Sequence, residues 1–335
     1  MLMVVMGAGA SFDSAPSHPV GPGTANGFRL PLADHLFDIR PEFRHAIQSY
    51  SQIHPIVPYL RERGARSLEE VLQELYENAT DHPERRKQML ALRFYIRDVI
   101  HSCSTQWLKE VDGVTNHKTL IDQLLERPME RTLLVTFNYD ELIEDALLGL
   151  GFRTEHFDDY ITRMTKFALY KLHGSVRWAR LVKASARVTV GELIEEAARY
   201  DLQDRRAFRF YNNLGATTID DWLAVPAIAI PVNRKSDFEC PTTHLDNLRQ
   251  QLPHVDKILA IGWRAKEAHF LSLLTTHLRH LRAIWVVSKG DAVTILRDLT
   301  SQLASKFESD ISTQAFDNGF TSFVTGKTGR ALFDL

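Results

Sequence analysis

The sequence predicts an α/β protein built on a doubly wound, Rossmann-like parallel sheet of about six strands, with a helical insertion. Three observations lead to this fold class. Short apolar runs recur along the 335-residue chain, helical segments separate most of them, and a glycine pair follows the first run. Runs of Val, Ile and Leu without polar alternation are typical of parallel strands covered on both faces. Their alternation with helices is typical of a doubly wound sheet.

Six apolar runs are predicted to be strands of this sheet. In chain order they are Leu2–Met6, Thr132–Thr136, Ala168–Leu172, Ala227–Pro231, Ile258–Ile261 and Ala283–Val287. A chain of this length suits one large α/β domain with an inserted module, or two modest domains.

The stretch from about residue 41 to residue 128 interrupts the alternation, because it contains no convincing strand. The segment Ser67-Leu68-Glu69-Glu70 has the pattern of a capping box that opens a helix. Residues 84–103 have the pattern of a second long helix. We therefore predict a helical insertion at 41–128, within a Rossmann domain formed by residues 1–40 and 129–335.

Composition excludes several kinds of site. The formal net charge is -2, so the chain as a whole offers no electrostatic reason to bind nucleic acid. The chain has two cysteines, Cys103 and Cys240, so it cannot form a four-cysteine structural zinc site by itself. No apolar stretch reaches the roughly 20 residues that a membrane helix needs, and the N-terminus lacks the features of a signal peptide. We therefore expect a cytoplasmic protein without zinc and without a membrane partner.

The first candidate site follows the first predicted strand, at Gly7-Ala8-Gly9-Ala10-Ser11. Glycines in this position let the backbone turn sharply and approach a pyrophosphate. The next helix would direct its N–H groups toward the phosphates. Phe12 stands where a GxGxxG motif has its third glycine, and a tight turn that binds nothing is the alternative interpretation.

Two further strand ends carry polar residues. The second predicted strand runs into Asn138-Tyr139-Asp140, and the third runs into His173-Gly174-Ser175. Polar residues at the carboxyl ends of parallel strands point into the crevice where such sheets bind ligands. The simpler alternatives are that Asn138 or Asp140 caps the next helix and that His173 is structural. Because three strand ends in a row carry such residues, we favour a ligand site.

At these strand ends the chain resembles the sirtuin superfamily. The Asn-Tyr-Asp form, followed by Glu141 and Glu144, is similar to the bacterial sirtuin-like branch associated with antiphage defence, whose members hydrolyse NAD. The resemblance is carried by Gly7-Ala8-Gly9-Ala10-Ser11, Asn138-Tyr139-Asp140, Lys171-Leu172-His173-Gly174-Ser175 and, more weakly, Ile261-Gly262-Trp263.

The resemblance implies NAD binding by the Rossmann domain and assigns roles to its motifs. Asn138 and His173 would be the pair required for cleavage, and Asp140 would lie beside the nicotinamide or its ribose. Around Gly262 the family usually has a serine two residues on and an aspartate five on, where this chain has Arg264 and Glu267. The residues assigned to binding NAD are Gly7, Ala8, Gly9, Ser11, Asp140 and Gly262.

The expected reaction is hydrolysis of the nicotinamide–ribose bond of NAD. His173 has a reference pKa near ~6.5 and can accept a proton at neutral pH. Asn138 can hydrogen-bond the ribose hydroxyls or the attacking water. Protein deacylation is the main alternative, and the lack of a four-cysteine zinc module disfavours it. A non-catalytic NAD or ADP-ribose sensor and a purely structural subunit are further alternatives, and neither would need both Asn138 and His173.

We also expect regulation and partner proteins. An NAD hydrolase that is always active would deplete the cell, so we expect a silent state and a trigger. We expect a homo-oligomer, with the helical insertion contributing to its interface. In the family, such subunits often work beside an ATPase, a nuclease or an argonaute-like protein. The chain itself contains no GxxxxGK[ST] motif.

Overall fold

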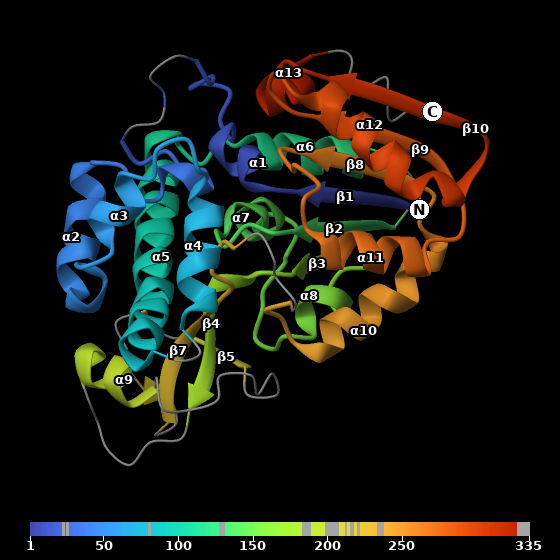
Figure 1. Cartoon of the computed structure of the whole chain (residues 1–335). Helices are drawn as coiled ribbons and strands as arrows, with labels where there is room; N and C mark the ends of the chain where they lie inside the picture. Colours follow the sequence, from blue (N-terminus) through green and yellow to red (C-terminus); the bar gives the residue numbers. More distant parts are fainter. Residues whose placement is uncertain are drawn as a thin grey trace. The chain divides into compact units, whose positions relative to one another are not determined.

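The computed structural model describes residues 1–21, 24, 27–79, 82–126, 131–182, 189–197, 208–211, 213–214, 218–219, 222–232 and 238–326. The chain divides into two compact units (Figure 1). Unit 1 comprises Met1–Thr24, Gln106–Leu172 and Thr243–Leu335, and unit 2 comprises Ala25–Thr105 and His173–Thr242.

A six-stranded parallel sheet forms the centre of unit 1, in the order β10-β9-β8-β1-β2-β3. Taken in chain order, these strands have the neighbour order 3-2-1-4-5-6, which is that of a doubly wound Rossmann sheet. The predicted fold class is therefore confirmed. The strands are β1 (Leu2–Met6), β2 (Thr132–Thr136), β3 (Phe167–Lys171), β8 (Lys257–Ile261), β9 (Leu281–Val287) and β10 (Phe307–Phe316).

Helices cover both faces of this sheet (Figure 1). The chain runs from β1 to β2 and β3 in one direction and from β8 to β9 and β10 in the other. Because crossovers between parallel strands are right-handed, the two sets of helices lie on opposite faces. The helices are α1 (Ala8–Phe12), α6 (Asn116–Leu125), α7 (Leu142–Leu148), α8 (Asp159–Thr162), α10 (Thr242–Gln251), α11 (Ala268–His277), α12 (Ala292–Leu303) and α13 (Gly319–Thr325).

Unit 2 combines helices with a second, antiparallel sheet in the order β5-β4-β7-β6. The strands are β4 (Gly174–Val182), β5 (Phe208–Phe210), β6 (Thr218–Ile219) and β7 (Trp222–Ile228). The helices are α2 (Pro41–Ser49), α3 (Val57–Arg61), α4 (Leu68–Glu77), α5 (Pro83–Glu110, whose last residues belong to unit 1) and α9 (Val190–Ala197).

Most local predictions hold, and one is wrong. The predicted strands 2–6 and 132–136 coincide with β1 and β2, and three others overlap β3, β8 and β9. Ala227–Pro231 was assigned to the parallel sheet, but β7 occupies 222–228 and pairs antiparallel to β4. Its apolar run is buried within unit 2, so burial alone did not identify its sheet. The sixth parallel strand is β10.

The described part of the stretch 41–126 is helical, and its capping box is present. The Ser67 hydroxyl accepts from Glu70 N–H at 3.2 Å, while the Glu70 carboxylate accepts from Ser67 N–H at 2.8 Å. The boundary at 128/129 lies outside the described residues, and the division into 1–40 plus 129–335 and 41–128 stays a prediction. In the described part of the chain, no helix combines the length and apolarity that crossing a membrane requires.

Candidate functional site

Four neighbouring strands of unit 1 end in the predicted motifs. Met6, Thr136, Lys171 and Ile261 lie in register across β1, β2, β3 and β8, so all four strands end at the same edge of the sheet. Gly7 and Gly262 follow β1 and β8 directly. The chain reverses its winding between these two strands, and doubly wound sheets bind ligands at such a switch point.

The glycines at the switch point are required by close backbone packing. A Cβ on Gly7 would lie 2.6 Å from the Gly262 carbonyl oxygen, and one on Gly9 would lie 2.8 Å from Gly262 Cα. Gly262 itself has a φ of +57°, in the left-handed region that glycine tolerates best. A side chain at Gly7 or Gly9 would therefore clash with the end of β8 before it reached any ligand.

The backbone N–H groups of this turn are partly used within the protein. Gly7 N–H donates to the Ile261 carbonyl at 3.1 Å, Gly9 N–H to the Gly262 carbonyl at 3.1 Å, and Ala10 N–H to the Gly7 carbonyl at 2.9 Å. Ala8 is the exposed residue of the turn. Its N–H is at the first position of α1, where a helix provides no internal acceptor. Ala8 is thus the best-placed backbone donor for a phosphate.

Asn138, Ser11 and Asp140 form one buried hydrogen-bonded group beside the turn. The Asn138 amide nitrogen donates to the Gly7 carbonyl at 2.9 Å and to Ser11 Oγ at 2.8 Å. The Ser11 hydroxyl donates to Asp140 Oδ2 at 2.6 Å, and Asp140 Oδ1 accepts from Leu142 N–H at 3.1 Å. Asp140 therefore does bond to the start of α7, as the capping alternative expected, whereas Asn138 bonds to the glycine turn.

Two charged residues that received no role from the sequence support this group. Lys171, only 1% exposed, donates to the Asp140 carbonyl and forms an ion pair with Glu144, Nζ to Oε1, at 2.9 Å. Burial raises the pKa of Glu144, and the Lys171 charge opposes that shift. A lysine at the end of an otherwise apolar strand was the available signal, because a buried lysine needs a partner.

His173 is placed by the chain two residues after β3 ends, at the start of the unit 2 segment. It is 2% exposed, and its carbonyl accepts from Ala229 N–H at 2.9 Å, which joins it to the segment after β7. Gly174 follows with a φ of +87°, where the left-handed conformation favours glycine. The residues that hydrogen bonds and backbone packing join in unit 1 are Gly7, Gly9, Ser11, Asn138, Asp140 and Gly262.

The segment after α1 is fixed by its own buried hydrogen bonds within unit 1. Asp13 accepts from the Thr321 hydroxyl at 2.7 Å and from Thr321 N–H at 3.0 Å, at the start of α13. The Ser14 hydroxyl accepts from the Trp107 indole at 2.8 Å, and the Ser14 carbonyl accepts from Asn116 N–H at 2.7 Å. These bonds hold the glycine turn from its carboxyl side.

Arg264 and Glu267, the departures from the family pattern, lie in the loop between β8 and α11. Glu267 accepts from the Trp263 indole at 2.5 Å, and Trp263 stacks on Phe137 with 5.7 Å between ring centroids. Glu267 therefore holds the loop in place, while Arg264 is exposed.

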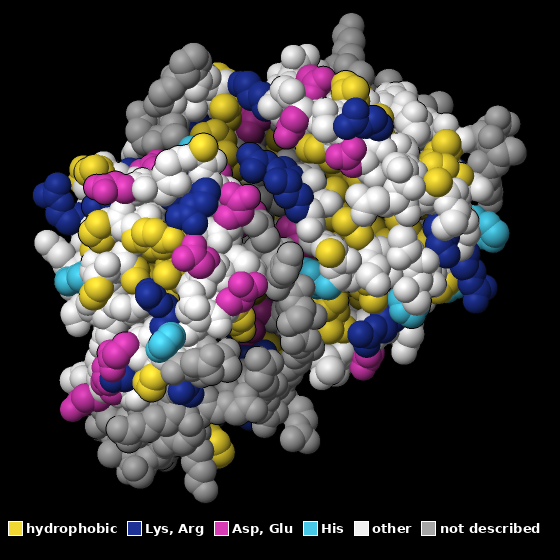
Figure 2. All heavy atoms as spheres, in the orientation of Figure 1, with side chains coloured by type: hydrophobic (Ala, Val, Ile, Leu, Met, Phe, Trp, Pro, Cys, Tyr) yellow, Lys and Arg dark blue, Asp and Glu magenta, His cyan; other side chains and the backbone are white. Residues whose placement is uncertain are grey.

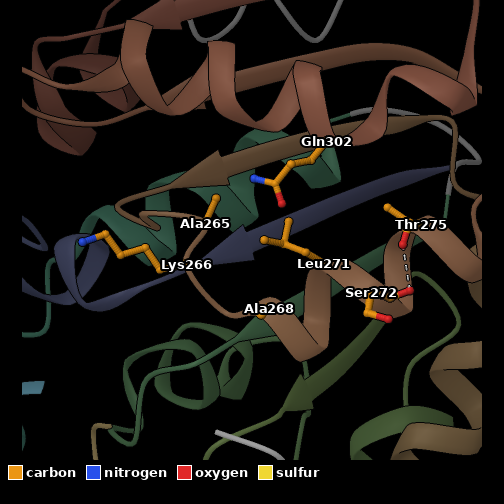
Figure 3. A pocket seen from close by; sticks show the side chains of 7 residues that line it. All are labelled: Ala265, Lys266, Ala268, Leu271, Ser272, Thr275 and Gln302. Atoms are coloured by element: carbon orange, nitrogen blue, oxygen red, sulfur yellow. Dashed lines mark hydrogen bonds between the residues drawn. The ribbon is translucent and has the colours of Figure 1, made fainter. Parts of the chain in front are cut away.

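A separate open pocket of about 420 Å³ lies in unit 1 along α11 (Figure 3). Leu271 lies near its centre, and the Thr275 hydroxyl donates to the Ser272 carbonyl at 3.0 Å beside it. None of the predicted site residues lines it. The lining residues are Ala265, Lys266, Ala268, Leu271, Ser272, Thr275 and Gln302.

The described residues show no group of three or more His, Cys, Asp or Glu side chains that could hold a metal ion. Cys103 and Cys240 are both buried. On the face drawn in Figure 2, basic and acidic side chains are interspersed, and neither sign covers a broad area of its described part.

Comparison with known proteins gives one family match. The sequence profile of the SIR2-like domain matches residues 132–309, from β2 into β10. No curated protein matches the chain.

Solved structures of sirtuins resemble the chain at low identity. A Sir2 homologue in complex with NAD is 13% identical, with coverage of 99% of this chain and 90% of that chain and a TM-score of 0.40. A mutant Sir2 homologue in complex with ADP-ribose is 14% identical, with coverage of 99% and 93% and a TM-score of 0.41. A sirtuin structure that addresses the structural basis of sirtuin substrate affinity is 15% identical, with coverage of 97% of this chain and 91% of that chain and a TM-score of 0.38. The assignment therefore comes from the profile match, which covers more than half of the 335 residues: the chain belongs to the SIR2-like domain family.

Proposed function

We propose that this protein is an NAD hydrolase that cleaves the nicotinamide–ribose bond to give nicotinamide and ADP-ribose. Membership of the SIR2-like family supports an NAD-using enzyme of the sirtuin type. The observation that carries the proposal is the direct bonding of Asn138 to Gly7 and Ser11. It joins the asparagine expected to act on the ribose to the turn expected to approach the pyrophosphate.

The proposed reaction needs little acid catalysis. The bond from ribose C1′ to the pyridinium nitrogen breaks with its electron pair going to that nitrogen, so nicotinamide leaves as a neutral molecule. Water attacks C1′ through an oxocarbenium-like transition state, as in glycoside hydrolysis. His173 accepts a proton from that water or from a ribose hydroxyl and later releases it to solvent.

The other groups of the site bind NAD and orient the ribose and the attacking water. Asn138 offers its amide oxygen to a ribose hydroxyl or to the water, since both amide hydrogens are already donated. Ala8, the exposed residue of the turn, would offer its N–H to the pyrophosphate, while Gly7, Gly9 and Gly262 give the turn its shape. We propose that the protein acts as a homo-oligomer with a contribution from residues 41–128, and that it is a regulated, NAD-depleting effector in antiphage defence.

The test is to incubate purified protein with NAD over a range of protein concentrations and to quantify nicotinamide and ADP-ribose. Asn138→Ala and His173→Ala should each reduce nicotinamide release ~10²- to 10⁴-fold, the usual effect of losing a positioned catalytic group. NAD binding should weaken less, because the turn that approaches the pyrophosphate is unchanged. Exposed Asn78 and His254, each changed to Ala, are the matched controls.

Three outcomes would replace this proposal. Release of nicotinamide only when an acetylated peptide is added would indicate a deacylase. Binding of NAD without turnover in the wild type would indicate a sensor. A wild-type rate in His173→Ala would remove His173 from the reaction.

A further inference from the structure

The Asn138 amide has one fixed orientation, which follows from the hydrogens around it. The Gly7 carbonyl can only accept, so the atom of Asn138 that faces it at 2.9 Å must be the amide nitrogen. The second amide hydrogen goes to Ser11 Oγ at 2.8 Å. Asn138 is 9% exposed, and no described residue donates to its Oδ1. The oxygen is thus the group that a ligand would meet.

Ser11 can accept from Asn138 only if its own hydrogen points elsewhere. A hydroxyl has a single hydrogen, and that of Ser11 goes to Asp140 Oδ2 at 2.6 Å. Because Asp140 Oδ2 takes this hydrogen, Asp140 fixes the direction of the Ser11 hydroxyl, and Ser11 in turn fixes the Asn138 amide.

Asp140 is itself held at three points. Its Oδ1 accepts from Leu142 N–H at 3.1 Å, its Oδ2 accepts from Ser11, and its carbonyl accepts from Lys171 Nζ. Lys171 is anchored by Glu144 at 2.9 Å. Both carboxylate oxygens of Asp140 therefore have partners within unit 1, although the resemblance placed this side chain beside the nicotinamide or its ribose.

We propose that Asp140 and Ser11 are positioning residues that act through Asn138: together they set the direction of a hydrogen-bond relay, anchored by Lys171, that makes the Asn138 oxygen the acceptor for the reacting ribose or water. This assignment rests on the proposed function for its reaction. It differs from direct contact of Asp140 with NAD, because its effect must pass through the Ser11 hydroxyl.

The variant Asp140→Asn tests the direction of the relay with little change in shape. The introduced amide must keep an oxygen toward Leu142 N–H, so its NH₂ group faces Ser11 and donates to it. The Ser11 hydroxyl then loses the acceptor for its hydrogen, so nothing keeps that hydrogen away from the Asn138 amide, where a donor would meet a donor. The expected result is a ~10²-fold lower kcat, the effect of misplacing one reacting contact, with a much smaller change in KM.

Ser11→Ala, alone and combined with Asp140→Asn, tests whether the effect of Asp140 on Asn138 passes through the Ser11 hydroxyl. Ser11→Ala leaves Asn138 bonded to the Gly7 carbonyl, so kcat should fall only about fivefold, the effect of one net hydrogen bond. In the Ser11→Ala background there is no hydroxyl through which a change at residue 140 can affect the Asn138 amide. Adding Asp140→Asn should therefore cause no further loss, and this strong non-additivity is the signature of the relay.

The matched control is Asp145→Asn, the same chemical change five residues further along the chain, on α7. Asp145 pairs with Lys118 at 2.9 Å and has no bond to Ser11 or Asn138 in the described residues. Its kcat should equal that of the wild type. Melting temperatures of all variants separate loss of the fold from loss of the relay. Additive effects of Ser11→Ala and Asp140→Asn would overturn the relay and favour direct contact of Asp140 with the substrate.

A second measurement does not depend on turnover. In protein labelled with ¹⁵N-asparagine, the side-chain amide signals of Asn138 are identified by their loss in Asn138→Ala. Both hydrogens should exchange slowly with solvent in the wild type, and one of them should exchange faster in Ser11→Ala. Rapid exchange of both in the wild type overturns the relay. Slow exchange in a wild-type protein that does not cleave NAD supports the orientation and overturns the proposed function instead.

Discussion

Each compact unit contains a buried group of three charged side chains, and the two groups differ in composition and in their connections. In unit 1 the strand-end cluster consists of Asp140, Glu144 and Lys171. In unit 2 the helix–sheet cluster consists of Arg93 on α5, Arg180 on β4 and Glu239, whose carboxylate pairs with both arginines.

The two clusters differ in the residues to which their hydrogen bonds lead. From the strand-end cluster they pass through Asp140 and Ser11 to Asn138 at a strand end. The helix–sheet cluster joins a helix, a strand and a loop, and Arg180 lies 4.7 Å from the Phe208 ring centroid. Desolvation offsets much of the attraction in either cluster. Burial of charge therefore does not identify a functional group by itself, whereas connection to a side chain that can meet a ligand does.

The largest effect is expected from Lys171→Met, which leaves Glu144 buried without its cation. Removing one partner of a buried pair typically costs ~3–5 kcal/mol of unfolding free energy. Denaturant unfolding measures this loss, and the Asn138 amide exchange described above should accelerate as well. Unchanged amide exchange in a folded Lys171→Met protein would show that the strand-end cluster serves packing only, which would remove the contrast between the two clusters.

Glu239→Gln is the corresponding change in unit 2. A neutral acceptor remains for Arg180, so we expect a smaller loss of unfolding free energy, about 2–3 kcal/mol. Hydrogen exchange should locate that loss in α5 and β4. The Asn138 amide signals and kcat should remain those of the wild type. A loss of kcat larger than the loss of folded protein would show that this cluster too acts on the site.

His117 on α6 is a further buried titratable group, and it interacts electrostatically with Asp140 and Lys171 of the strand-end cluster. Burial lowers the pKa of His117 to about 4, Asp140 and Asp145 oppose this shift, and Lys171 adds to it. Between about pH 4 and 6.5 the unfolded chain binds more protons at this residue than the folded protein does. The unfolding free energy should therefore fall as pH falls, by about 2 kcal/mol between pH 7 and pH 5.

The matched variant is His117→Leu, which keeps an apolar side chain against Phe320, 5.4 Å away between the ring centroids in the wild type. Subtracting its pH profile from that of the wild type isolates His117 from the other buried histidines. Parallel profiles for the two proteins would mean that His117 does not titrate differently on folding.

The smallest effect is expected at a helix end in unit 2 that is distant in sequence from both clusters. Ser67→Ala removes the side-chain half of the capping box of α4 and should lower stability by ~1 kcal/mol. Hydrogen exchange should report this loss in peptides covering α4, with kcat unchanged. A change in the Asn138 amide signals here would show that the readout follows general stability and is not specific to the strand-end cluster.

Much of unit 1 could be predicted from the sequence, because its parallel strands are continuous apolar runs. β10 was missed because residues 307–316 include Glu308, Ser309, Asp310 and Gln314, as an edge strand can tolerate. The antiparallel sheet of unit 2 was missed for a different reason. β7 is as apolar as a parallel strand, and its partners β5 and β6 are only three and two residues long.

The candidate site residues could be located at strand ends from the sequence, but their bonding could not. The direction of a hydroxyl or an amide depends on which groups meet in space, and Ser11 and Asp140 are 129 residues apart. Lys171 and Glu144 stood within the quoted motifs, and only the three-dimensional pairing gives them a role.

The central position of β1 has a consequence for how the protein is made. β1 pairs on one side with β2, which begins at residue 132, and on the other with β8, which begins at residue 257. At about 5–20 residues per second, a ribosome needs roughly 13–50 seconds to reach β8 after β1 has emerged. During that time one edge of β1 has no native partner, and unpaired apolar strand edges readily join other chains. Unit 1 therefore completes its sheet late in synthesis, and slower elongation before residue 257 lengthens the period in which the nascent chain can aggregate.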